Sequence, residues 1–332
     1  MPELPEPDDA LPELGADARK SLQRSMCEAL RLPRDAEVGP AEWGPITELV
    51  VAGPSADDRV AAWLANRHAG MSGLRTLHFQ LTQISDAGVK ALAHQRTGLA
   101  ALTALWFHHA RLTSASVESL AHRDCGLRAL TCLALSNTGV DDDGLRSLSR
   151  PDGMLAGLRH LMLTNIDMTD VGVEHLAGVT SGLRSLESLF LSHVPVTDAA
   201  LATIARPTSG LGTLELLSFG QTGISDTGVQ LLCQPETSLS KLTNLELGEN
   251  ALTDAALEAL ARPDSGLKSL ASLTLSYTGV TDAGLMTLCR PDSGLAGLRY
   301  LGLYRTGVSD AAIDALKRQR PGLEIGREER RA

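Results

Sequence analysis

A strict repeat of 28 residues constrains the fold of this chain more than any other feature of its sequence. The pattern L-x-x-L-x-(L/F) begins at nine positions, each 28 residues after the last, with no insertion between them. These positions are Leu74, Leu102, Leu130, Leu158, Leu186, Leu214, Leu242, Leu270 and Leu298. Because ITELVV from Ile46 lies one period upstream, ten copies extend over about residues 46–321. A period of this regularity predicts an array of similar supersecondary units.

Within each copy the apolar spacing changes from that of a strand to that of a helix. In LASLTLSYTGVTDAGLMTL, Leu273 and Leu275 alternate with polar residues, which predicts a short strand. Val280, Leu285 and Leu288 then recur at helical spacing. The Ser/Thr-Asp pair between the two segments is expected to cap the helix and to place a carboxylate at its positive end. Proline and glycine in RPDSG are expected to end the helix.

One such copy cannot fold alone, because ordering its residues costs more free energy than its few buried apolar side chains return. Stacking buries both sides of each copy and aligns the strands as a parallel sheet, with the helices on the opposite side. Helices are wider than the spacing between strands, so the stack must curve with the strands inside. The sequence therefore predicts an α/β solenoid of horseshoe shape, with strands on the concave face and helices on the convex face.

The full repeat, L-x-x-L-x-L-x-x-(T/N)-x-(V/I/L)-(T/S)-D-x-(G/A)-L-x-x-L, resembles a leucine-rich repeat of the ribonuclease-inhibitor-like class. The resemblance covers residues 46–321 and implies macromolecular binding, sometimes inhibition, without identifying the partner. A polar ladder is expected after the strands, at Thr82, Thr138, Thr222, Asn250, Thr278 and Thr306. Ala110, Ile166 and Val194 interrupt this ladder, and Ser114 replaces the usual aspartate of its copy.

The segments that flank the array are expected to close its ends. Residues 16–45 resemble the helical N-terminal cap of bacterial leucine-rich-repeat proteins, because residues 17–32 place their apolar side chains on one side of a helix. Residues 1–15 are acidic and proline-rich and are expected to be disordered. Residues 322–332 are expected to form a C-terminal cap with a charged tail.

Composition excludes several classes of protein. A net charge of −10 and a pI near 5.4 argue against a nucleic-acid-binding protein, which needs a basic surface. The five cysteines are odd in number and unclustered, which favours free thiols in a reducing compartment and no zinc site. The N-terminus lacks the apolar segment of a signal peptide or membrane anchor. We therefore expect a cytoplasmic protein that binds neither nucleic acid nor membrane.

Catalytic signatures are lacking from the sequence, which contains no phosphate-binding loop, HExxH motif or nucleophile elbow. The row of aspartates is explained by helix capping. Five histidines fall on the expected concave face, at His78, His108, His109, His160 and His193. They leave open a metal-dependent enzyme, although no pair has i, i+4 helix spacing. We expect no catalytic residues and no cofactor or metal.

Two groups of side chains are predicted on the concave face, where strand positions 3, 5 and 7 point away from the core and position 8 lies at the margin. The first group is Trp106, His108, His109, His160, Met162, Phe190 and Leu216. The second is Tyr277, Tyr300, Tyr304 and Arg305, with Arg299 beside it. All three tyrosines of the chain belong to this second group. Because Tyr, Trp and Arg dominate protein–protein affinity, these groups are the predicted partner-binding residues.

The sequence thus predicts a non-catalytic scaffold that binds a partner protein in its concave face, as a monomer or in a hetero-complex. The acidic net charge favours a partner with a neutral to basic surface. A sensor or regulatory subunit, including an inhibitory one, of an effector enzyme encoded nearby is an alternative. A metal-dependent enzyme that uses the concave histidines is an alternative of another class.

Overall fold

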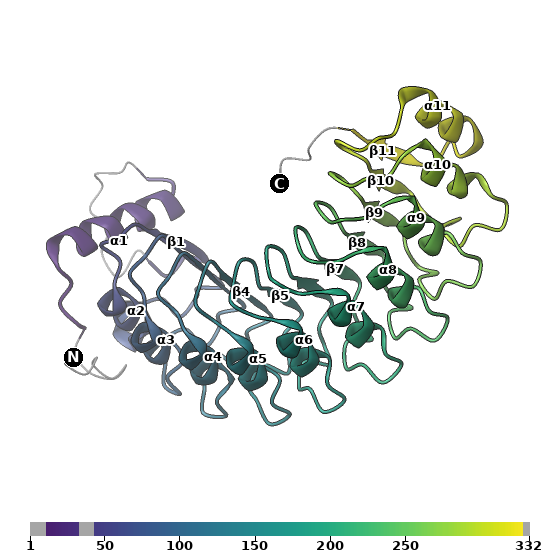
Figure 1. The fold of residues 1–332 in the computed structure, drawn as a ribbon. Helices are drawn as coiled ribbons and strands as arrows, with labels where there is room; N and C mark the ends of the chain where they lie inside the picture. Colours follow the sequence, from purple (N-terminus) through teal and green to yellow (C-terminus); the bar gives the residue numbers. More distant parts are fainter. Residues whose placement is uncertain (1–10, 33–42, 328–332) are drawn as a thin grey trace. The chain divides into compact units, whose positions relative to one another are not determined.

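The computed structural model describes residues 11–32 and 43–327. Contacts between residues divide the chain into two compact units, Met1–Asp167 and Met168–Ala332, and each unit is described by itself. Both units repeat the predicted alternation of one strand and one helix (Figure 1). No helix in the described ranges is long and apolar enough to cross a membrane.

The first unit begins with a helix and then alternates strands and helices. Its elements are α1 (Ala16–Ala29), β1 (Glu48–Ala52), α2 (Asp58–Ala65), the 3-10 helix η2 (Arg67–Ala69), β2 (Thr76–Gln80), α3 (Asp86–Leu92), β3 (Ala104–His108), α4 (Ser114–Ala121), β4 (Cys132–Ser136), α5 (Asp142–Leu148) and β5 (His160–Met162). Strands β1 to β5 pair in parallel in chain order, and α2 to α5 cover one face of the sheet (Figure 1). Helix α1 contacts β1.

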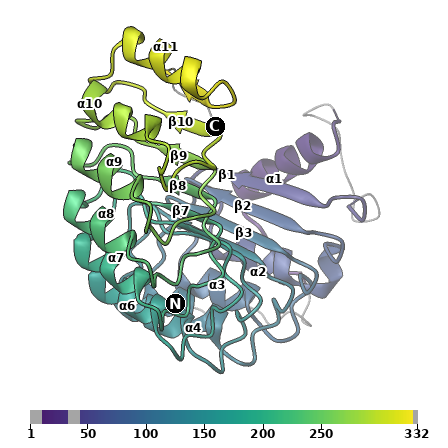
Figure 2. The same cartoon turned by 90° about the vertical axis from the view of Figure 1, so that its right-hand side faces the viewer.

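The second unit continues the same alternation. Its elements are α6 (Asp170–Ala177), β6 (Ser188–Phe190), α7 (Asp198–Ala205), β7 (Leu216–Ser218), α8 (Asp226–Leu232), β8 (Asn244–Glu246), α9 (Asp254–Leu260), β9 (Ser272–Thr274), α10 (Asp282–Leu285), the 3-10 helix η3 (Met286–Cys289), β10 (Tyr300–Gly302), α11 (Asp310–Gln319) and β11 (Glu324–Gly326). Strands β6 to β11 are parallel neighbours in chain order, with the helices stacked along one side (Figure 2).

The strand register between complete copies equals the sequence period. Thr76 pairs with Ala104, and Ala104 pairs with Cys132, so equivalent residues of successive copies are direct neighbours. The repeat-defining leucines lie under the sheet and are buried, together with the stacked rings of Phe79 and Phe107, whose centroids are 5.3 Å apart. Alternate residues therefore form columns on the opposite side, which we call the strand face: the face of each sheet that the helices do not cover.

One repeat position takes a left-handed backbone conformation in nine copies; it directly follows β2, β3 and β4 and lies three residues after the end of β5 to β10. These residues are Leu81, His109, Asn137, Asn165, His193, Gln221, Glu249, Tyr277 and Arg305, with φ between 51° and 58°. The turn lets the N–H of Leu81 reach the carbonyl of His108 in the next copy (2.8 Å), and the N–H of Tyr277 reach that of Tyr304 (2.7 Å). The repeat thus fixes the backbone at this position. Asparagine tolerates such a φ, whereas larger side chains do so at a cost.

In each Ser/Thr-Asp pair the two residues have different structural roles. The hydroxyl caps its own helix, as Ser225 does by accepting from the N–H of Thr227 (3.2 Å). The aspartate lies in the first helical turn, as expected, but its hydrogen bonds go to a neighbouring copy. The carboxylate of Asp198 accepts from the N–H (2.8 Å) and the hydroxyl (2.6 Å) of Ser225. The same two bonds to the following copy are made by Asp58, Asp86, Asp170, Asp226, Asp254 and Asp282.

The copy in which Ser114 replaces aspartate keeps this link in an inverted form. Asp141 occupies the position of the next Ser/Thr, and the hydroxyl of Ser114 donates to its carboxylate. Asp141 also caps α5 by accepting from the N–H groups of Asp143 (3.0 Å) and Gly144 (3.4 Å). The two departures from the consensus therefore compensate each other.

Because these carboxylates accept hydrogen bonds in the folded chain, we expect the stability of the fold to decrease in acid. Burial alone would raise the pKa of Asp86, but hydrogen bonds from Ser116 and Thr113 outweigh it and hold that pKa below its ordinary value. The backbone N–H and then the hydroxyl of Ser309 lower the pKa of Asp282. Since these pKa values are lower in the folded than in the unfolded chain, the stabilisation is present above about pH 4 and is lost as the pH falls through the folded values.

We therefore expect the melting temperature to fall slightly between about pH 7 and 5, where His78 and His108 with their lowered pKa values oppose protonation, and to fall steeply below about pH 4. The difference in melting temperature between the wild type and Asp86→Asn should shrink over the same range, because the variant has already lost the titrating group. Asp292→Asn changes an exposed aspartate and should follow the wild type. Circular dichroism melts at several pH values measure these differences. Parallel profiles for the wild type and Asp86→Asn would contradict the prediction.

The polar ladder is complete in only part of the chain. In the second unit, the Asn250 amide donates to the carbonyls of Phe219, Leu247 (3.1 Å) and Gly248 (3.2 Å), and its oxygen accepts from the N–H and hydroxyl of Thr222 (2.9 Å each). In the first unit the hydroxyls of Thr82 and Thr138 are buried without a hydrogen-bond partner in the described chain. Thr82 and Thr138, which were expected to be members of the ladder, therefore add no side-chain hydrogen bond to it.

Both ends of the array are covered by the chain itself. At the N-terminal end, α1 buries Leu22 and Met26, and the Ser21 hydroxyl donates to the Ala52 carbonyl of β1 (3.1 Å). Residues 1–10 of the segment expected to be disordered lie outside the described ranges. The packing of α1 covers the edge strand β1, which would otherwise expose unpaired backbone groups.

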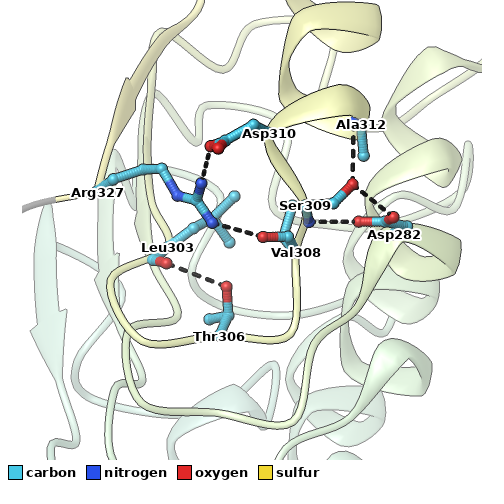
Figure 3. A network of polar contacts seen from close by, with 8 residues as sticks. All are labelled: Asp282, Leu303, Thr306, Val308, Ser309, Asp310, Ala312 and Arg327. Atoms are coloured by element: carbon cyan, nitrogen blue, oxygen red, sulfur yellow. Dashed lines mark hydrogen bonds and ion pairs between the residues drawn. The ribbon is translucent and has the colours of Figure 1, made fainter.

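At the C-terminal end, the expected truncated copy PGLEI contributes β11, which pairs with β10. Arg327 donates to the Asp310 carboxylate and to the Val308 carbonyl (2.5 Å), which joins the end of β11 to the start of α11 (Figure 3). The Arg320 guanidinium donates to three carbonyls of the preceding loop, those of Leu295 (2.8 Å), Ala296 (2.9 Å) and Leu298 (3.1 Å). Residues 328–332 of the expected tail lie outside the described ranges.

Candidate functional site

The strand face of the first unit carries a row of large side chains across neighbouring strands. Val50, His78, Trp106, Ala134 and Met162 follow one another in register from β1 to β5. The His78 and Trp106 rings stack with centroids 4.7 Å apart and planes 23° apart. Ala134 lies on the same face but is only 3% exposed, because Trp106 and Met162 flank it. The row is therefore one continuous, largely apolar surface rather than a set of isolated side chains.

Trp106 has a polar atom that the fold does not satisfy well. Its Nε1 is buried and has no oxygen or nitrogen acceptor, with only the Cys132 thiol, a weak acceptor, beside it. Burial raises the pKa of that thiol, so it stays protonated near neutral pH. His160, next to Cys132 in register, is half-buried. This part of the face therefore carries a neutral thiol and one shielded indole N–H.

A second feature of the same face is a pair of imidazoles at the ends of the strands. The exposed rings of His108 and His109 meet edge to face, 4.4 Å apart. A chain of amides continues from them, since Asn165 donates to Asn137 (2.7 Å) and the Asn137 amide lies 3.4 Å from His108 Nδ1. Burial, and then the charge of His109, lower the pKa of His108. His108 is therefore neutral at physiological pH.

Sequence reasoning placed His78 on this face but did not include it among the binding residues. In the structure His78 stacks on Trp106 and therefore belongs to the same row of side chains. Its Nε2 lies 3.9 Å from a carboxylate oxygen of Glu48. Burial lowers the pKa of His78, and Glu48 opposes this effect. The sequence contained the information needed to group His78 with Trp106, because a constant period of 28 residues makes residues 28 apart neighbours on adjacent strands.

Phe190 and Leu216, which the sequence groups with Trp106, belong to the second unit. Both are half-buried on its strand face, where Phe190 is next to Ser218 and Leu216 is next to Ser188 in register. The predicted first group is therefore divided between the two units. Five of its members lie in the first unit and two in the second.

Tyr277, Tyr304 and Arg305 form one cluster at the margin of the second unit's strand face. The two tyrosine rings meet edge to face with centroids 5.2 Å apart, and the Arg305 guanidinium lies 6.0 Å from the Tyr277 centroid and 5.6 Å from that of Tyr304. Arg305 Nε also donates to the Tyr304 hydroxyl (3.3 Å). Tyr277 is 39% exposed, which is high for so large a side chain. The cluster holds two rings and a cation together at the surface.

Tyr300 and Arg299 take different positions from this cluster. The Tyr300 hydroxyl lies over Gly326 of β11, so closely that a Cβ added to Gly326 would be 2.3 Å away. Tyr300 therefore packs on the terminal strand and is half-buried. Arg299 is exposed in the turn before β10, and its carbonyl accepts the N–H of Glu324 (2.8 Å). The predicted second group thus consists of a surface cluster, a ring that packs on the last strand, and an arginine outside the strand.

The histidines of the strand faces do not assemble a metal centre. Within residues 11–32 and 43–327, no three His, Cys, Asp or Glu side chains are placed so that they could hold a metal ion. No cysteine of these ranges forms a disulfide.

The family comparison agrees with this repeat geometry. The model of the leucine rich repeat family matches residues 73–93, 127–149, 238–261 and 264–289, each of which covers a strand and its helix. The chain is a leucine-rich repeat protein. Its architecture is the solenoid of that family, in which every repeat adds one parallel strand and one helix. None of the curated protein sequences matches this repeat protein.

Solved structures with the same architecture share little sequence with this leucine-rich repeat protein. TLR13 in the TLR13–ssRNA13 complex is 20% identical with a TM-score of 0.50, over 82% of this chain and 38% of that chain. An internalin (inlF) of Listeria monocytogenes is 18% identical with a TM-score of 0.45, over 94% and 95% of the two chains. InlP of Listeria monocytogenes is 12% identical with a TM-score of 0.42, over 90% and 68%. At such identities the likeness concerns the fold alone.

Proposed function

We propose that this leucine-rich repeat protein is a non-catalytic scaffold of the ribonuclease-inhibitor-like class that binds a partner protein on its strand faces. The observation that carries the proposal is the Tyr277–Tyr304–Arg305 cluster. Tyr277 and Arg305 sit at left-handed positions that would suit asparagine better, so the fold gains nothing from their size. Large, surface-held rings beside an arginine are typical of residues that dominate protein–protein affinity. Repeat arrays offer such extended surfaces for partners.

The first unit supports the same proposal with a different chemistry. Trp106, His78 and Met162 form a row that is neither fully buried nor charged at neutral pH, so their accessible ring and side-chain atoms can contact a partner. Amphipathic rings of this kind bury a large area while retaining a polar tip. We infer that this row contributes apolar contacts, whereas the tyrosine cluster contributes polar and cation–π contacts.

The charge of the protein supports a partner with a neutral to basic surface. The net charge is −10, and the strand face of the second unit carries Glu246, next to Thr274 in register, and Glu249, one period before Tyr277. Complementary charge speeds association and excludes acidic competitors. A cytoplasmic hetero-complex with such a protein is the arrangement that we propose. A regulatory subunit of an enzyme is one form that it could take.

The test compares the strand faces with the opposite side of the same protein. Wild type and a Trp106→Ala/Tyr277→Ala/Tyr304→Ala variant are used to capture partners from the native cell extract, and the captured protein is then produced and its affinity measured. We expect the variant to bind at least about 30-fold more weakly, since one hot-spot side chain contributes about 2 kcal/mol or more. Circular dichroism establishes that the variant is folded.

The matched control is Val171→Ala/Leu231→Ala/Met286→Ala, which truncates three exposed apolar side chains of the helical side. This variant should bind the partner with wild-type affinity. The opposite result, with full binding by the strand-face variant and loss in the helical-side variant, would move the interface to the helices.

A further inference from the structure

The strand face of the first unit carries several histidines and few fixed charges. β2, β3 and β5 contain His78, His108 and His160, and His109 follows β3 directly. None of the residues of β2 to β5 is Asp, Glu, Lys or Arg, so the charge of these strands depends on their imidazoles. Histidine is the side chain whose ordinary pKa lies within the range of mildly acidic pH. The charge of this face therefore changes when the solution becomes mildly acidic.

His78 lies between a carboxylate and an aromatic ring. Its Nε2 is 3.9 Å from Glu48 of β1, and Glu28 and Arg31 line the same cleft between α1 and β1 as Glu48 does. On its other side the ring stacks on Trp106, with centroids 4.7 Å apart. Burial lowers the pKa of His78 more than the charge of Glu48 raises it. The ring is therefore neutral at pH 7, and in acid it becomes a cation stacked on the indole.

The His108–His109 pair has different surroundings, because its neighbours are uncharged. Gln80 and Ser136 are next to His108 in register, the Asn137 amide lies 3.4 Å from its Nδ1, and the His109 ring meets it 4.4 Å away. Burial, and then the charge of His109, lower the pKa of His108. Protonation of both rings would place two like charges side by side, which is unfavourable for their edge-to-face contact.

Protonation of His108 also changes hydrogen bonds beyond the end of β5. The Asn165 amide donates to the Asn137 oxygen (2.7 Å), which orients the Asn137 nitrogen toward Nδ1 of His108. Nδ1 can accept this bond in the neutral ring but carries a proton in the cation. Asn137 must then turn its oxygen toward the ring, and Asn165 is left facing a donor. One proton therefore reverses a row of amides along the margin of the face.

We propose that the strand face of the first unit is a proton-controlled binding surface, which holds its partner at neutral pH and releases it as His78, His108 and His109 become cations. This inference rests on the proposed function, because it concerns the same face and the same neutral to basic partner. Such a partner covers the rings and brings no negative charge to them, so the complex holds fewer protons than the separated proteins. Affinity is therefore greatest at neutral pH and falls as the pH falls.

Collisional quenching of Trp106 measures the charge of this face in the free protein. Trp106 is half-buried, and it becomes the only tryptophan of the full-length chain in Trp43→Phe/Trp63→Phe. From about pH 7.5 to 5 we expect the quenching constant of iodide to rise about twofold, that of caesium to fall, and that of uncharged acrylamide to stay the same. Adding His78→Gln, His108→Gln and His109→Gln should remove most of both changes. Iodide and caesium quenching that is independent of pH, or that changes equally in the histidine variant, would overturn the proposal.

Histidine resonances give a second measurement, which needs no change at the buried Trp43 and Trp63. In the wild type, the ring C–H resonances of His78 and His108 are assigned by comparison with His78→Gln and His108→Gln. Both should move between about pH 7.5 and 5, with midpoints below about 6.5. Midpoints above about pH 7, or resonances that do not move in this range, would overturn the proposal.

Release is measured with the protein captured on the strand faces. Its affinity for the wild type should fall about tenfold from about pH 7.5 to 5, and by less than about threefold for His78→Gln/His108→Gln/His109→Gln. The matched control replaces as many histidines of the same unit away from its strand face, in η2 and directly after α3 and α4. This variant, His68→Gln/His94→Gln/His122→Gln, should keep the pH dependence of the wild type.

The two ways in which this measurement can fail are distinct. If the Trp106→Ala/Tyr277→Ala/Tyr304→Ala variant loses binding at about pH 7.5 but the wild-type affinity is the same at about pH 5, the proton-controlled release is wrong and the proposed function stands. If that variant binds as the wild type does at about pH 7.5, the proposed function is wrong, and the release that depends on it is wrong too.

Discussion

Replacing Asn250 with alanine is expected to destabilise the second unit by about 3–5 kcal/mol, because it leaves several buried groups without partners. The side chain is 7% exposed. Its amide donates to the carbonyls of Phe219 and Leu247, and its oxygen accepts from the N–H and hydroxyl of Thr222. Alanine can replace none of these bonds. Urea unfolding followed by circular dichroism gives the change in free energy, and hydrogen exchange should show the largest loss of protection around β7 and β8.

Thr138→Val is the matched control for this prediction. Thr138 has the equivalent position in the first unit, but its buried hydroxyl has no hydrogen-bond partner in the described residues. Valine already occupies this position at Val194, where it is buried. We expect stability to be unchanged or to rise by about 1 kcal/mol, since an unsatisfied polar group is removed. If the two substitutions cost the same, the ladder would contribute through side-chain volume and not through hydrogen bonds.

Replacing Arg320 with methionine is expected to loosen the C-terminal end, with a cost of about 2–3 kcal/mol, because one guanidinium holds three carbonyls of the preceding loop. Burial lowers the pKa of Arg320 and Cys289 opposes this, but an arginine stays charged at any ordinary pH. The Arg320 guanidinium is therefore a cation when it donates hydrogen bonds to the carbonyls of the loop that leads into β10. Methionine retains much of the apolar stem and none of the donors.

The expected signature is local. Hydrogen exchange followed by mass spectrometry should show faster exchange in α11 and β11 of Arg320→Met, with little change in the first unit. Lys317→Met removes the same charge from an exposed position of α11 and should leave exchange unaltered. Equal effects of the two substitutions would assign the result to charge rather than to the three bonds.

The sequence was sufficient to predict the alternation of strand and helix, because one period is repeated with every copy contributing the same apolar positions. It also predicted which residues leave the core, since side chains in a strand alternate. The truncated copy at Leu323, which contributes the last strand, could be recognised from its apolar pattern alone. These features depend on the residues within one copy, and the consensus pattern lists the residues of one copy.

Contacts between copies were harder to predict. The aspartates were expected to stabilise the starts of their own helices, yet the Asp198 carboxylate accepts hydrogen bonds from Ser225 of the following copy. The left-handed turn at Tyr277 has no signature in residue types, since most copies place bulky residues there. Tyr300 follows the alternation, but its ring inclines toward Gly326, the only kind of residue small enough to allow it.

The inverted pair of Ser114 and Asp141 has a consequence for the history and the engineering of this array. Restoring the consensus at Ser114 alone would set two carboxylates against each other, and restoring it at Asp141 alone would leave two hydroxyls and no acceptor charge. Neither repeat can therefore be exchanged, duplicated or deleted by itself without damage to the joint between them. Where an aspartate accepts from the Ser or Thr of the following copy, as Asp198 does from Ser225, this particular link would survive an exchange of copies. The Ser114–Asp141 pair instead fixes the order of its two copies at this link.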